Sequence, residues 1–584
     1  MRFITEDKKM NDLLSELLSE IPAARGLDID VCLERCDEGL SVWQDAEGWH
    51  MAYSTLSSLW RGATLLAERA AGGISERVDQ TPAFETLGVV VDMSSNAAMK
   101  PSAIKRFCRL LASEGYDCLM LKTFKGAALT ADADRSVLLG RYSEAELTEL
   151  DAYAASLGIA LTPYIQLSEL VSLGDTESFC EKMDEALCAY SEILSSRRIC
   201  FGFDRPRLAG CEKYPNIGDV AENDTFTERF RALSELCGKY GYEATVGGDV
   251  LDHIDGTEQS FTYAVSECTS VDRNKYRELI EKLGERAENV GFVGGDNGWY
   301  GAVPLSWLSH TVACATIPVL LEKTPKQVYV AMWRDDTAAC SYFATLPVLF
   351  AYGETCWART DYTEHLSKRM LSVCGVDFYD MVPLEDIPAI RCRLNTGRTI
   401  VTPGRYMLYD KVIGGAYDYH STGGVNHLKN ITVWMAERIE RAGEFAYVFE
   451  SQVAFSNILA TKADISETLR RAFRKNWPHV IGEIYSENFE KATDAVDKFL
   501  ATLEKQWERE CMDFGMELIR ERAKLVKRRI MEGKPLVGEY LAGNESALDM
   551  LKIPPVPCKY DAELIHDQAA VLLSDFDMIN DAIE

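Results

Sequence analysis

A short apolar run that ends on charged side chains is the most chemically suggestive part of the sequence. The stretch FGFDRPRLAG, residues 201–210, reads as the end of a buried strand followed at once by Asp204, Arg205 and Arg207. A carboxylate beside two guanidinium groups could bind a polar ligand or support catalysis. The same three groups could also be a structural ion-pair cluster. The two interpretations are separated only by what else lies near this strand end.

Polar residues also end most of the other apolar runs in this part of the chain. They are Asp92, Lys122, Gln166, Asp204, Asp249, Asp296, Asp335 and Asp336. Any one of them could be no more than the N-cap of the helix that follows. Their recurrence at run after run favours a shared site, because the carboxyl ends of the strands in a parallel barrel meet at one mouth.

The runs themselves alternate with segments of helical spacing. They cover residues 87–94, 116–123, 159–166, 198–204, 242–249, 260–267, 290–296 and 327–336. Continuous apolar strands that alternate with helices indicate a parallel sheet buried on both faces. Eight units in about 270 residues match an α/β fold of the (β/α)8 TIM barrel type, with an open doubly wound sheet as the alternative.

Two further domains flank the predicted barrel. Residues 1–82 contain a strand-like piece at 48–54 and a helix-like piece at 56–73, which indicate a small α/β domain. After about residue 356 the alternation stops and long helical stretches follow. In residues 487–507 the apolar positions recur every three or four residues, which predicts one face of a bundle helix. We therefore expect domains at 1–82, 83–355 and 356–584, the last of them α-helical.

Charge and composition exclude several classes of function. The 584 residues carry a formal net charge of −29, which argues against a nucleic-acid partner. The sequence has no long apolar run that would predict a membrane span, and residues 1–20 lack the core of a signal peptide. The seventeen cysteines form no CxxC pair, and Cys32 and Cys36 have no matching second pair. We expect a cytoplasmic protein with no metal and no cofactor.

Five blocks of the sequence resemble glycoside hydrolase family 20, the β-N-acetylhexosaminidases, and most closely the branch with a C-terminal helical domain. The blocks are FETLGVVVDMSSNAAMK (84–100), GRYSEAELTELDAYAASLGIALTPYIQ (140–166), VYVAMWRDDTAACSYFATLPVLFAYGE (328–354), TPGRYMLYDKVIGGAYDYH (402–420) and FESQVAFSNILATKADISETLRRAF (449–473). They occur in the family's order along nearly the whole chain.

The resemblance implies catalytic roles for residues at the fourth strand. In the family this strand ends in an aspartate, which orients the substrate's 2-acetamido group, and a glutamate, which protonates the leaving oxygen. Asp204 matches the aspartate, and Arg205 stands where the glutamate is expected. A guanidinium stays protonated at physiological pH, so Arg205 cannot deliver that proton.

Other positions depart from the family or keep its pattern. Ser95 replaces an arginine of the first strand, Ala339 replaces a glutamate, and Lys122, Lys125 and Arg334 add positive charge. The resemblance places Asp249, Tyr263, Trp299, Trp333 and Asp335 in the sugar subsite. Aromatic faces and carboxylates are what a carbohydrate pocket requires, although Trp299 and Trp333 could also be packing residues of the barrel mouth.

Two functions remain open. One is a glycosidase for N-acetylhexosamine-containing or anionic (sulfated or uronic) glycans, in which the basic residues bind the anionic group and Glu169 or Asp296 replaces the missing acid. The other is a non-catalytic carbohydrate-binding relative that has kept the fold. In both cases the partner is a carbohydrate, and homodimer formation is left open.

Overall fold

The computed structural model describes most of the chain, and its residues form two compact units. The described residues are 1–5, 7–123, 142–166, 176–202, 223–252, 254, 256–268, 270–296, 306–334, 339–360, 362–382, 408–409, 411–414 and 422–553. The first unit comprises Met1–Asn297, Ser309–Trp333 and Thr345–Tyr379. The second comprises Gly298–Leu308, Arg334–Ala344 and Asp380–Glu584.

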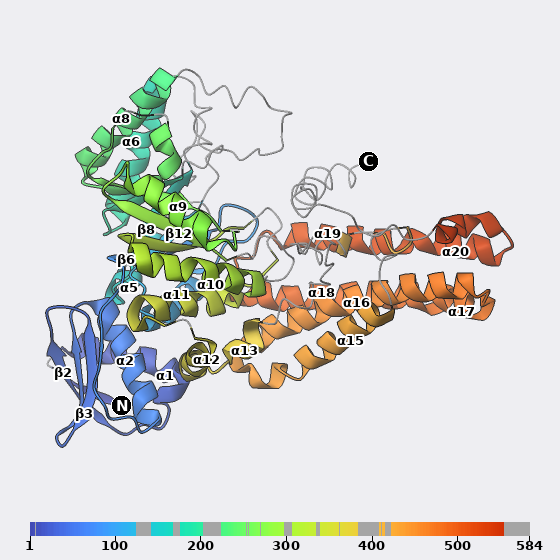
Figure 1. The fold of residues 1–584 in the computed structure, drawn as a ribbon, viewed down its shortest axis with the longest axis horizontal. Helices are drawn as coiled ribbons and strands as arrows, with labels where there is room; N and C mark the ends of the chain where they lie inside the picture. The colour runs from blue at the N-terminus through green and yellow to red at the C-terminus, as the bar shows by residue number, and fades with distance from the viewer. Residues whose placement is uncertain are drawn as a thin grey trace. The chain divides into compact units, whose positions relative to one another are not determined.

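The N-terminal domain is a five-stranded mixed sheet with helices on one face (Figure 1). The strands lie in the order β1 (Arg2–Ile4), β2 (Asp30–Arg35), β4 (Gly48–Tyr53), β3 (Leu40–Asp45) and β5 (Val78–Gln80). The helices are α1 (Lys8–Glu20) and α2 (Leu56–Ala71). Helix α2 begins with a capping box between Thr55 and Ser58, and it packs on the face that carries Met51. The small α/β domain predicted at residues 1–82 is therefore present.

Eight parallel strands close into a barrel, as the sequence predicted. They are β6 (Thr86–Asp92), β7 (Cys118–Lys122), β8 (Ala160–Gln166), β9 (Arg198–Gly202), β10 (Glu243–Gly247), β11 (Phe261–Ser266), β12 (Val290–Gly295) and β13 (Gln327–Met332). Pairing of β13 with β6, from Gln327↔Thr86 to Met332↔Val91, closes the ring. The open doubly wound sheet is therefore wrong.

Helices connect most of the barrel strands. They are α3 (Pro101–Ser113), α5 (Glu144–Ser156), α6 (Thr176–Ile193), α8 (Asn223–Tyr240), α9 (Arg273–Gly284), α10 (Ser306–Lys323) and α11 (Leu346–Ala358). Local sequence explains where two of them begin: Pro101 occupies the first turn of α3, and Ser143 forms a capping box with Glu146 at α5. Between β10 and β11 the described residues form only a 3-10 helix, Gly248–Asp252.

The rest of the described chain is helical. It contains α12 (Thr363–Cys374), α13 (Phe378–Met381), α15 (Thr422–Ala436), α16 (Ala446–Arg474), α17 (Pro478–Glu483), α18 (Phe489–Glu510), α19 (Met516–Met531) and α20 (Gly533–Leu541). The predicted face of α18 is buried throughout: Phe489, Ala492, Val496, Phe499, Leu503 and Trp507. Among the helices of the described residues, none is both long and apolar enough to span a membrane.

The domain boundary expected at 355/356 does not coincide with an end of either compact unit. It falls inside α11, and α12 belongs to the first unit, which extends to Tyr379. The reason is a buried side chain on α12. Arg369 reaches Glu114 at the end of α3 (Nε–Oε1 3.0 Å) and Glu68 of α2 (Nη1–Oε2 3.3 Å). These ion pairs hold α12 to the N-terminal domain and the barrel. The helical periodicity of the sequence does not reveal them.

Candidate functional site

The barrel interior is a packed core, so a ligand can enter only at the ends of the strands. The core residues that face inward are Val90, Cys118, Met120, Tyr164, Cys200, Tyr329 and Ala331, with Val293 and Trp333 against them. Gly88 shows how tightly Tyr329 fills this space, because a methyl group on Gly88 would stand 2.5 Å from the Tyr329 ring. Side chains fill the interior of such barrels, and active sites are built at the carboxyl end.

The amino-terminal end of the barrel is closed by polar contacts. Thr245 Oγ1 donates to Gln327 Oε1 at 2.8 Å, and Tyr329 donates to the same oxygen at 3.1 Å. Arg198 lies 3.8 Å from Asp117. Burial raises the pKa of Asp117 to about 6, although Arg198 acts to lower it. Charged groups at this end of a barrel serve stability rather than catalysis.

At the carboxyl end, Asp92 and Lys122 form a largely buried ion pair. Both side chains occupy inward-facing positions, at the last residues of β6 and β7, and Asp92 pairs with Lys122 in the strand register. Lys122 Nζ lies 3.4 Å from Asp92 Oδ2. Ser94 donates its backbone N–H (3.0 Å) and its hydroxyl (2.6 Å) to Asp92 Oδ1. The carboxylate is therefore held in place by its own loop, with Lys122 beside it.

Trp333 lies next to this pair and connects it to Tyr164. Lys122 Nζ is 5.9 Å from the centre of the Trp333 ring, within the range of a cation–π contact. The edge-to-face contact between Trp333 and Tyr164 has a centroid distance of 5.7 Å. Trp333 is half-buried. The carboxyl ends of four neighbouring strands, β13, β6, β7 and β8, thus bring together an indole, a carboxylate, an ammonium group and a phenol.

Gly202, the last residue of strand β9, leaves space at this end. A methyl group on Gly202 would stand 2.2 Å from the Tyr164 hydroxyl and 2.9 Å from Gln166 Oε1. Glycine at this position allows the Tyr164 ring to lie across the barrel next to β9. The sequence placed Gln166 among the polar strand ends but did not single out Tyr164. The only signal for Tyr164 was its spacing of two from Gln166, which puts both side chains on one face.

The predicted sugar-binding residues Asp249 and Tyr263 differ in where the structure places them. Asp249 lies in the 3-10 helix that follows β10, partly exposed and at the carboxyl end of the strand, as expected. Tyr263 has the opposite parity to Thr262 and Ala264, which face the interior, and its hydroxyl accepts a hydrogen bond from the Glu258 backbone N–H at 2.8 Å. Because Glu258 precedes β11, this hydroxyl is held toward the amino-terminal end. The geometry argues against a role for Tyr263 in binding sugar.

Asp296 occupies a structural position. It follows β12 and is buried, and one of its carboxylate oxygens accepts a hydrogen bond from the Thr345 hydroxyl. Thr345 is the residue immediately before α11, so the contact fixes the start of that helix. A carboxylate near a helix N-terminus is favoured by the unpaired N–H groups there. This arrangement argues against Asp296 as the replacement proton donor.

Arg334 and Ala339 belong to the second compact unit. Arg334 is buried, and its guanidinium carbon lies 4.9 Å from the centre of the Tyr342 ring. Gln506 of α18 donates to the Ala339 carbonyl at 2.8 Å. Glu510 of α18 accepts from the Tyr342 N–H at 2.8 Å and from the Ser341 hydroxyl. The helical domain therefore holds the segment that directly follows β13.

Several predicted site residues lie outside the described residues. They are the catalytic candidates Asp204 and Arg205, the subsite candidates Trp299 and Asp335, and also Lys125, Glu169 and Arg207. Ser95 is described, in the loop after β6, three residues beyond Asp92. Of the predicted site residues, the structure brings Lys122 and Trp333 together.

Metal-ligating side chains gather elsewhere. Among the described residues, the one group of His, Cys and carboxylate side chains close enough to share an ion lies in the N-terminal sheet, not in the barrel.

The C-terminal part of the chain matches a known domain. Residues 377–568 match the family model described as the glycoside hydrolase 20C C-terminal domain. No curated protein sequence matches the chain significantly.

Solved structures of three β-N-acetylhexosaminidase-type proteins are similar in outline. For the family 20 β-N-acetylhexosaminidase of Streptomyces coelicolor A3(2), the identity is 14%, the match covers 63% of this chain and 90% of that one, and the TM-score is 0.46. For the Streptomyces plicatus N-acetyl-β-hexosaminidase the values are 14%, 65%, 91% and 0.47. For the Vibrio harveyi exo-β-N-acetylglucosaminidase they are 13%, 66%, 74% and 0.45.

Proposed function

We propose, from the glycoside hydrolase family 20-like character of this chain, that it is a glycosidase for N-acetylhexosamine-containing or anionic glycans. The observation that carries the proposal is the cluster of Trp333, Asp92, Lys122 and Tyr164 at the carboxyl end of a closed barrel. This is the end at which such barrels build active sites. The match of residues 377–568 to the C-terminal domain of glycoside hydrolase 20C also supports the proposal.

Each member of the cluster suits one part of a sugar. The half-buried indole of Trp333 offers a face for stacking on a pyranose ring. Asp92, already oriented by Ser94, can accept a hydrogen bond from a sugar hydroxyl. Lys122 can bind a sulfate or carboxylate group on the sugar, because a compact ammonium pairs with an anion of either kind. Asp92 balances the charge of Lys122, so the preference for an anionic ligand rests on the other basic residues that follow the strands in a sequence of net charge −29, Lys125, Arg205 and Arg207.

The chemistry expected from the resemblance depends on Asp204 and Arg205. In the family reaction the acetamide oxygen of the substrate attacks the anomeric carbon, the glycosidic C–O bond breaks, and an acid protonates the leaving oxygen. Asp204 stands at the position that orients the acetamide. Arg205 cannot act as the acid, so the leaving oxygen must take its proton from water or from another side chain. A positioned acid commonly contributes about 10²–10⁴-fold to the rate.

A second candidate function is a carbohydrate-binding protein without catalysis. The observation that favours it is the same Arg205, because a fixed positive charge at the acid's position prevents proton donation and can bind an anionic substituent. The two functions share one ligand and differ only in turnover.

The test compares two leaving groups on two proteins. Wild-type protein and Arg205→Glu are incubated with a nitrophenyl and with a methyl N-acetyl-β-glucosaminide, and product release is measured. The nitrophenolate leaves with little help, whereas methoxide needs the acid. We expect slow cleavage of the nitrophenyl glycoside by the wild type and no measurable cleavage of the methyl glycoside. Arg205→Glu should raise the rate on both substrates and narrow the gap between them.

The outcomes separate the two functions. A wild type that cleaves both substrates at similar rates contradicts the proposed role of Arg205, since another residue must then donate the proton. A wild type that cleaves neither substrate but binds sulfated N-acetylglucosamine in calorimetry supports the binding protein. In that case Lys122→Met should weaken binding of the sulfated sugar more than binding of the neutral one. The partly buried lysine Lys105 on α3, which pairs with Glu149, provides the matched control, Lys105→Met.

A further inference from the structure

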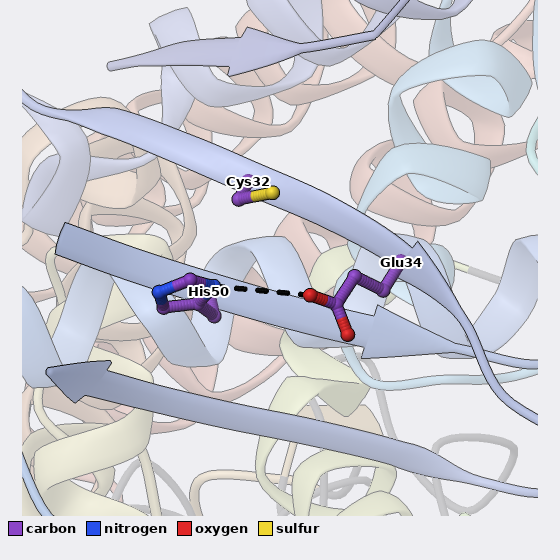
Figure 2. A group of neighbouring side chains, drawn as sticks. All are labelled: Cys32, Glu34 and His50. Atoms are coloured by element: carbon purple, nitrogen blue, oxygen red, sulfur yellow. Dashed lines mark ion pairs between the residues drawn. The ribbon is translucent and has the colours of Figure 1, made fainter. Parts of the chain in front are cut away.

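Three potential metal ligands gather on the N-terminal sheet, on the face opposite α2. Cys32 and Glu34 are two residues apart on β2, so their side chains lie on the same face. His50 lies on the neighbouring strand β4, directly paired with Cys32 in the register. Figure 2 shows the thiol, the imidazole and the carboxylate of these residues close to one another above the two strands.

The spacing of these groups is close to that of a formed zinc site. One ligand atom from each residue can be chosen so that all three lie within 4.8 Å of one another, and His50 Nδ1 is 3.9 Å from Glu34 Oε1. Tetrahedral zinc with ordinary bond lengths would place its ligand atoms about 3.3–3.6 Å apart. The separations in the structure are only slightly larger than those of a zinc site, and rotation of the exposed Glu34 side chain can shorten them.

His50 is already oriented as a metal-binding histidine is. Its Nε2 lies 3.0 Å from Asp45 Oδ1, so Nε2 carries the hydrogen and donates it to the carboxylate. The ring also stacks on Trp43, with a centroid distance of 5.0 Å and an interplanar angle of 4°. In histidines that bind metals, a carboxylate that is hydrogen-bonded to the other ring nitrogen fixes the tautomer and the ring orientation.

The other ring nitrogen of His50, Nδ1, makes no hydrogen bond. Nδ1 is buried and has no hydrogen-bond partner, and His50 as a whole is only 9% exposed. With the hydrogen on Nε2, this atom presents a bare lone pair toward Cys32 and Glu34. An unsatisfied buried acceptor costs free energy, about 1–3 kcal/mol, unless a partner satisfies it. A cation between the three side chains would be such a partner.

We propose that Cys32 Sγ, His50 Nδ1 and the Glu34 carboxylate bind a zinc ion, with water as the fourth ligand and Asp45 as the residue that positions His50. Thiolate, imidazole and carboxylate are the three side-chain ligands that zinc uses. Binding displaces the thiol proton of Cys32 to solvent and leaves the imidazole proton on Nε2. Cys32 is partly exposed and Glu34 is exposed, so the ion can reach the site.

The test uses zinc itself and the full chain. Metal-free protein is titrated with ZnCl₂ by calorimetry, and with CoCl₂ by absorption, in which a thiolate–cobalt charge-transfer band reports the cysteine ligand. Because the chain has seventeen cysteines, stoichiometry alone is insufficient. The variants are Cys32→Ser, His50→Gln, Glu34→Gln and Asp45→Asn. The control is Cys36→Ser, a thiol in the same sheet region that only donates to backbone carbonyls of Glu38 and Gly39.

We expect one zinc ion per chain with a Kd of about 1 µM or tighter, and the charge-transfer band, in the wild type and in Cys36→Ser. Cys32→Ser should abolish the band, and Cys32→Ser and His50→Gln should each weaken binding more than 100-fold. Asp45→Asn should weaken it about 10–100-fold, as loss of a carboxylate behind a ligand histidine does. Glu34 is exposed, so Glu34→Gln tests the site without disturbing the fold. Zinc affinity that is unchanged in Cys32→Ser and Glu34→Gln, or no zinc binding by the wild type, overturns the proposal.

Discussion

Trp333 contacts both an aromatic and a charged side chain at the carboxyl end of the barrel. It contacts Tyr164 on one side and Lys122 on the other, and it is half-buried. Such a ring can stack on a sugar only if its neighbours keep it in place. Tyr164 does this because Gly202 leaves it room. The proposed sugar binding and the packing of the barrel mouth therefore depend on the same few side chains.

Replacing Trp333 should weaken sugar binding. Trp333→Ala removes the stacking face, and we expect affinity for N-acetylglucosamine or its sulfated form to fall about 10-fold or more, since aromatic contacts of this kind contribute on the order of 1 kcal/mol beyond the area they bury. Calorimetric titration measures the change. The control is Trp477→Ala, which removes an exposed tryptophan of the helical domain and should leave affinity unchanged. Equal affinities for the wild type and Trp333→Ala would exclude Trp333 from the site.

A single methyl group on Gly202 should destabilise the barrel. Gly202→Ala drives the new carbon into the Tyr164 hydroxyl, and overpacking of this kind costs about 1–3 kcal/mol. Urea unfolding measures the loss. Gly238→Ala in α8 is the matched control, because a methyl group there meets nothing within 4 Å and removes a glycine from a helix. We expect it to stabilise the protein by about 0.5–1 kcal/mol. Equal effects of the two changes would contradict this account of Tyr164.

At the residue scale, the structure brings some of the predicted site residues together and places one of them elsewhere. Lys122 was predicted because polar residues at strand ends stand out, and Trp333 was predicted from the resemblance to the family. Tyr263 was not distinguishable from an inward-facing residue, since strands buried on both faces are apolar at every position and show no alternation. Only the register with Thr262 and Ala264 reveals that it faces outward.

At the scale of elements, buried charges join the N-terminal domain to the barrel. The groups are Arg61 and Glu68 of α2, Glu114, Glu354 of α11 and Arg369 of α12. Arg61 Nη1 lies 2.7 Å from Glu354 Oε1, and Arg369 Nε lies 3.0 Å from Glu114 Oε1. Burial raises the pKa of Glu114 well above its usual range. Burial acts in the same direction on Glu354, but Arg61, His365 and Arg369 hold its pKa well below that range.

The two glutamates should therefore respond differently to the same substitution. At neutral pH, Glu354→Gln leaves Arg61 buried without its closest charge, and we expect a loss of about 3–5 kcal/mol in the free energy of unfolding. Glu114→Gln replaces a group whose charged form is already disfavoured by burial, so its cost should be smaller, on the order of 1 kcal/mol. Urea unfolding at pH 7 measures both. Equal costs would contradict the opposite pKa shifts of the two glutamates.

The pH dependence of the two variants should have opposite sign. The folded pKa of Glu354 lies below the ordinary value of 4.5, so its stabilisation is present above that pH and is lost as the pH falls further. The penalty of Glu354→Gln should therefore shrink in acid. The folded pKa of Glu114 lies above 4.5, so its contribution is complete below that pH and is lost as the pH rises through the folded pKa. The penalty of Glu114→Gln should shrink toward neutral pH.

Element types were more predictable than element partners. The capping residues of α2 and α5 and the apolar spacing of α18 are local signals, and the structure confirms the helices that they indicate. The assignment of α12 depends on Arg369 meeting Glu114, 255 residues earlier in the chain. No local pattern carries that information. In the same way, Cys32, Glu34 and His50 become a group only through the parallel pairing of β2 and β4.

At the scale of the whole molecule, the second unit combines three separate parts of the sequence. Its segment Arg334–Ala344 follows the last barrel strand, and its helices come after Asp380. Glu510 and Gln506 of α18 hold this segment through Ser341, Tyr342 and the Ala339 carbonyl. The barrel architecture was predictable because eight strand and helix units repeat in order. This interleaving was not, because its contacts span more than 160 residues.

Removal of the Glu510 carboxylate should loosen this segment. Glu510→Ala leaves the Tyr342 N–H and the Ser341 hydroxyl without their acceptor, at a cost of about 2–3 kcal/mol for bonds to a buried charged group. Hydrogen exchange of the Tyr342 amide and urea unfolding measure the effect. Glu508→Ala, on the exposed side of α18, is the control and should leave both unchanged. Normal protection of the Tyr342 amide in Glu510→Ala would show that the segment is held by other contacts.

The contact between Ser341 and Glu510 also sets an order of events during synthesis. The two residues are 169 positions apart. At a translation rate of about 5–20 residues per second, the segment after the last strand emerges roughly 10–30 s before α18 exists to hold it. For that time the ribosome-bound chain carries Ser341 and Tyr342 without their partner, however early the barrel strands pair. Completion of this part of the molecule is therefore a late step, governed by how fast the C-terminal helices are made.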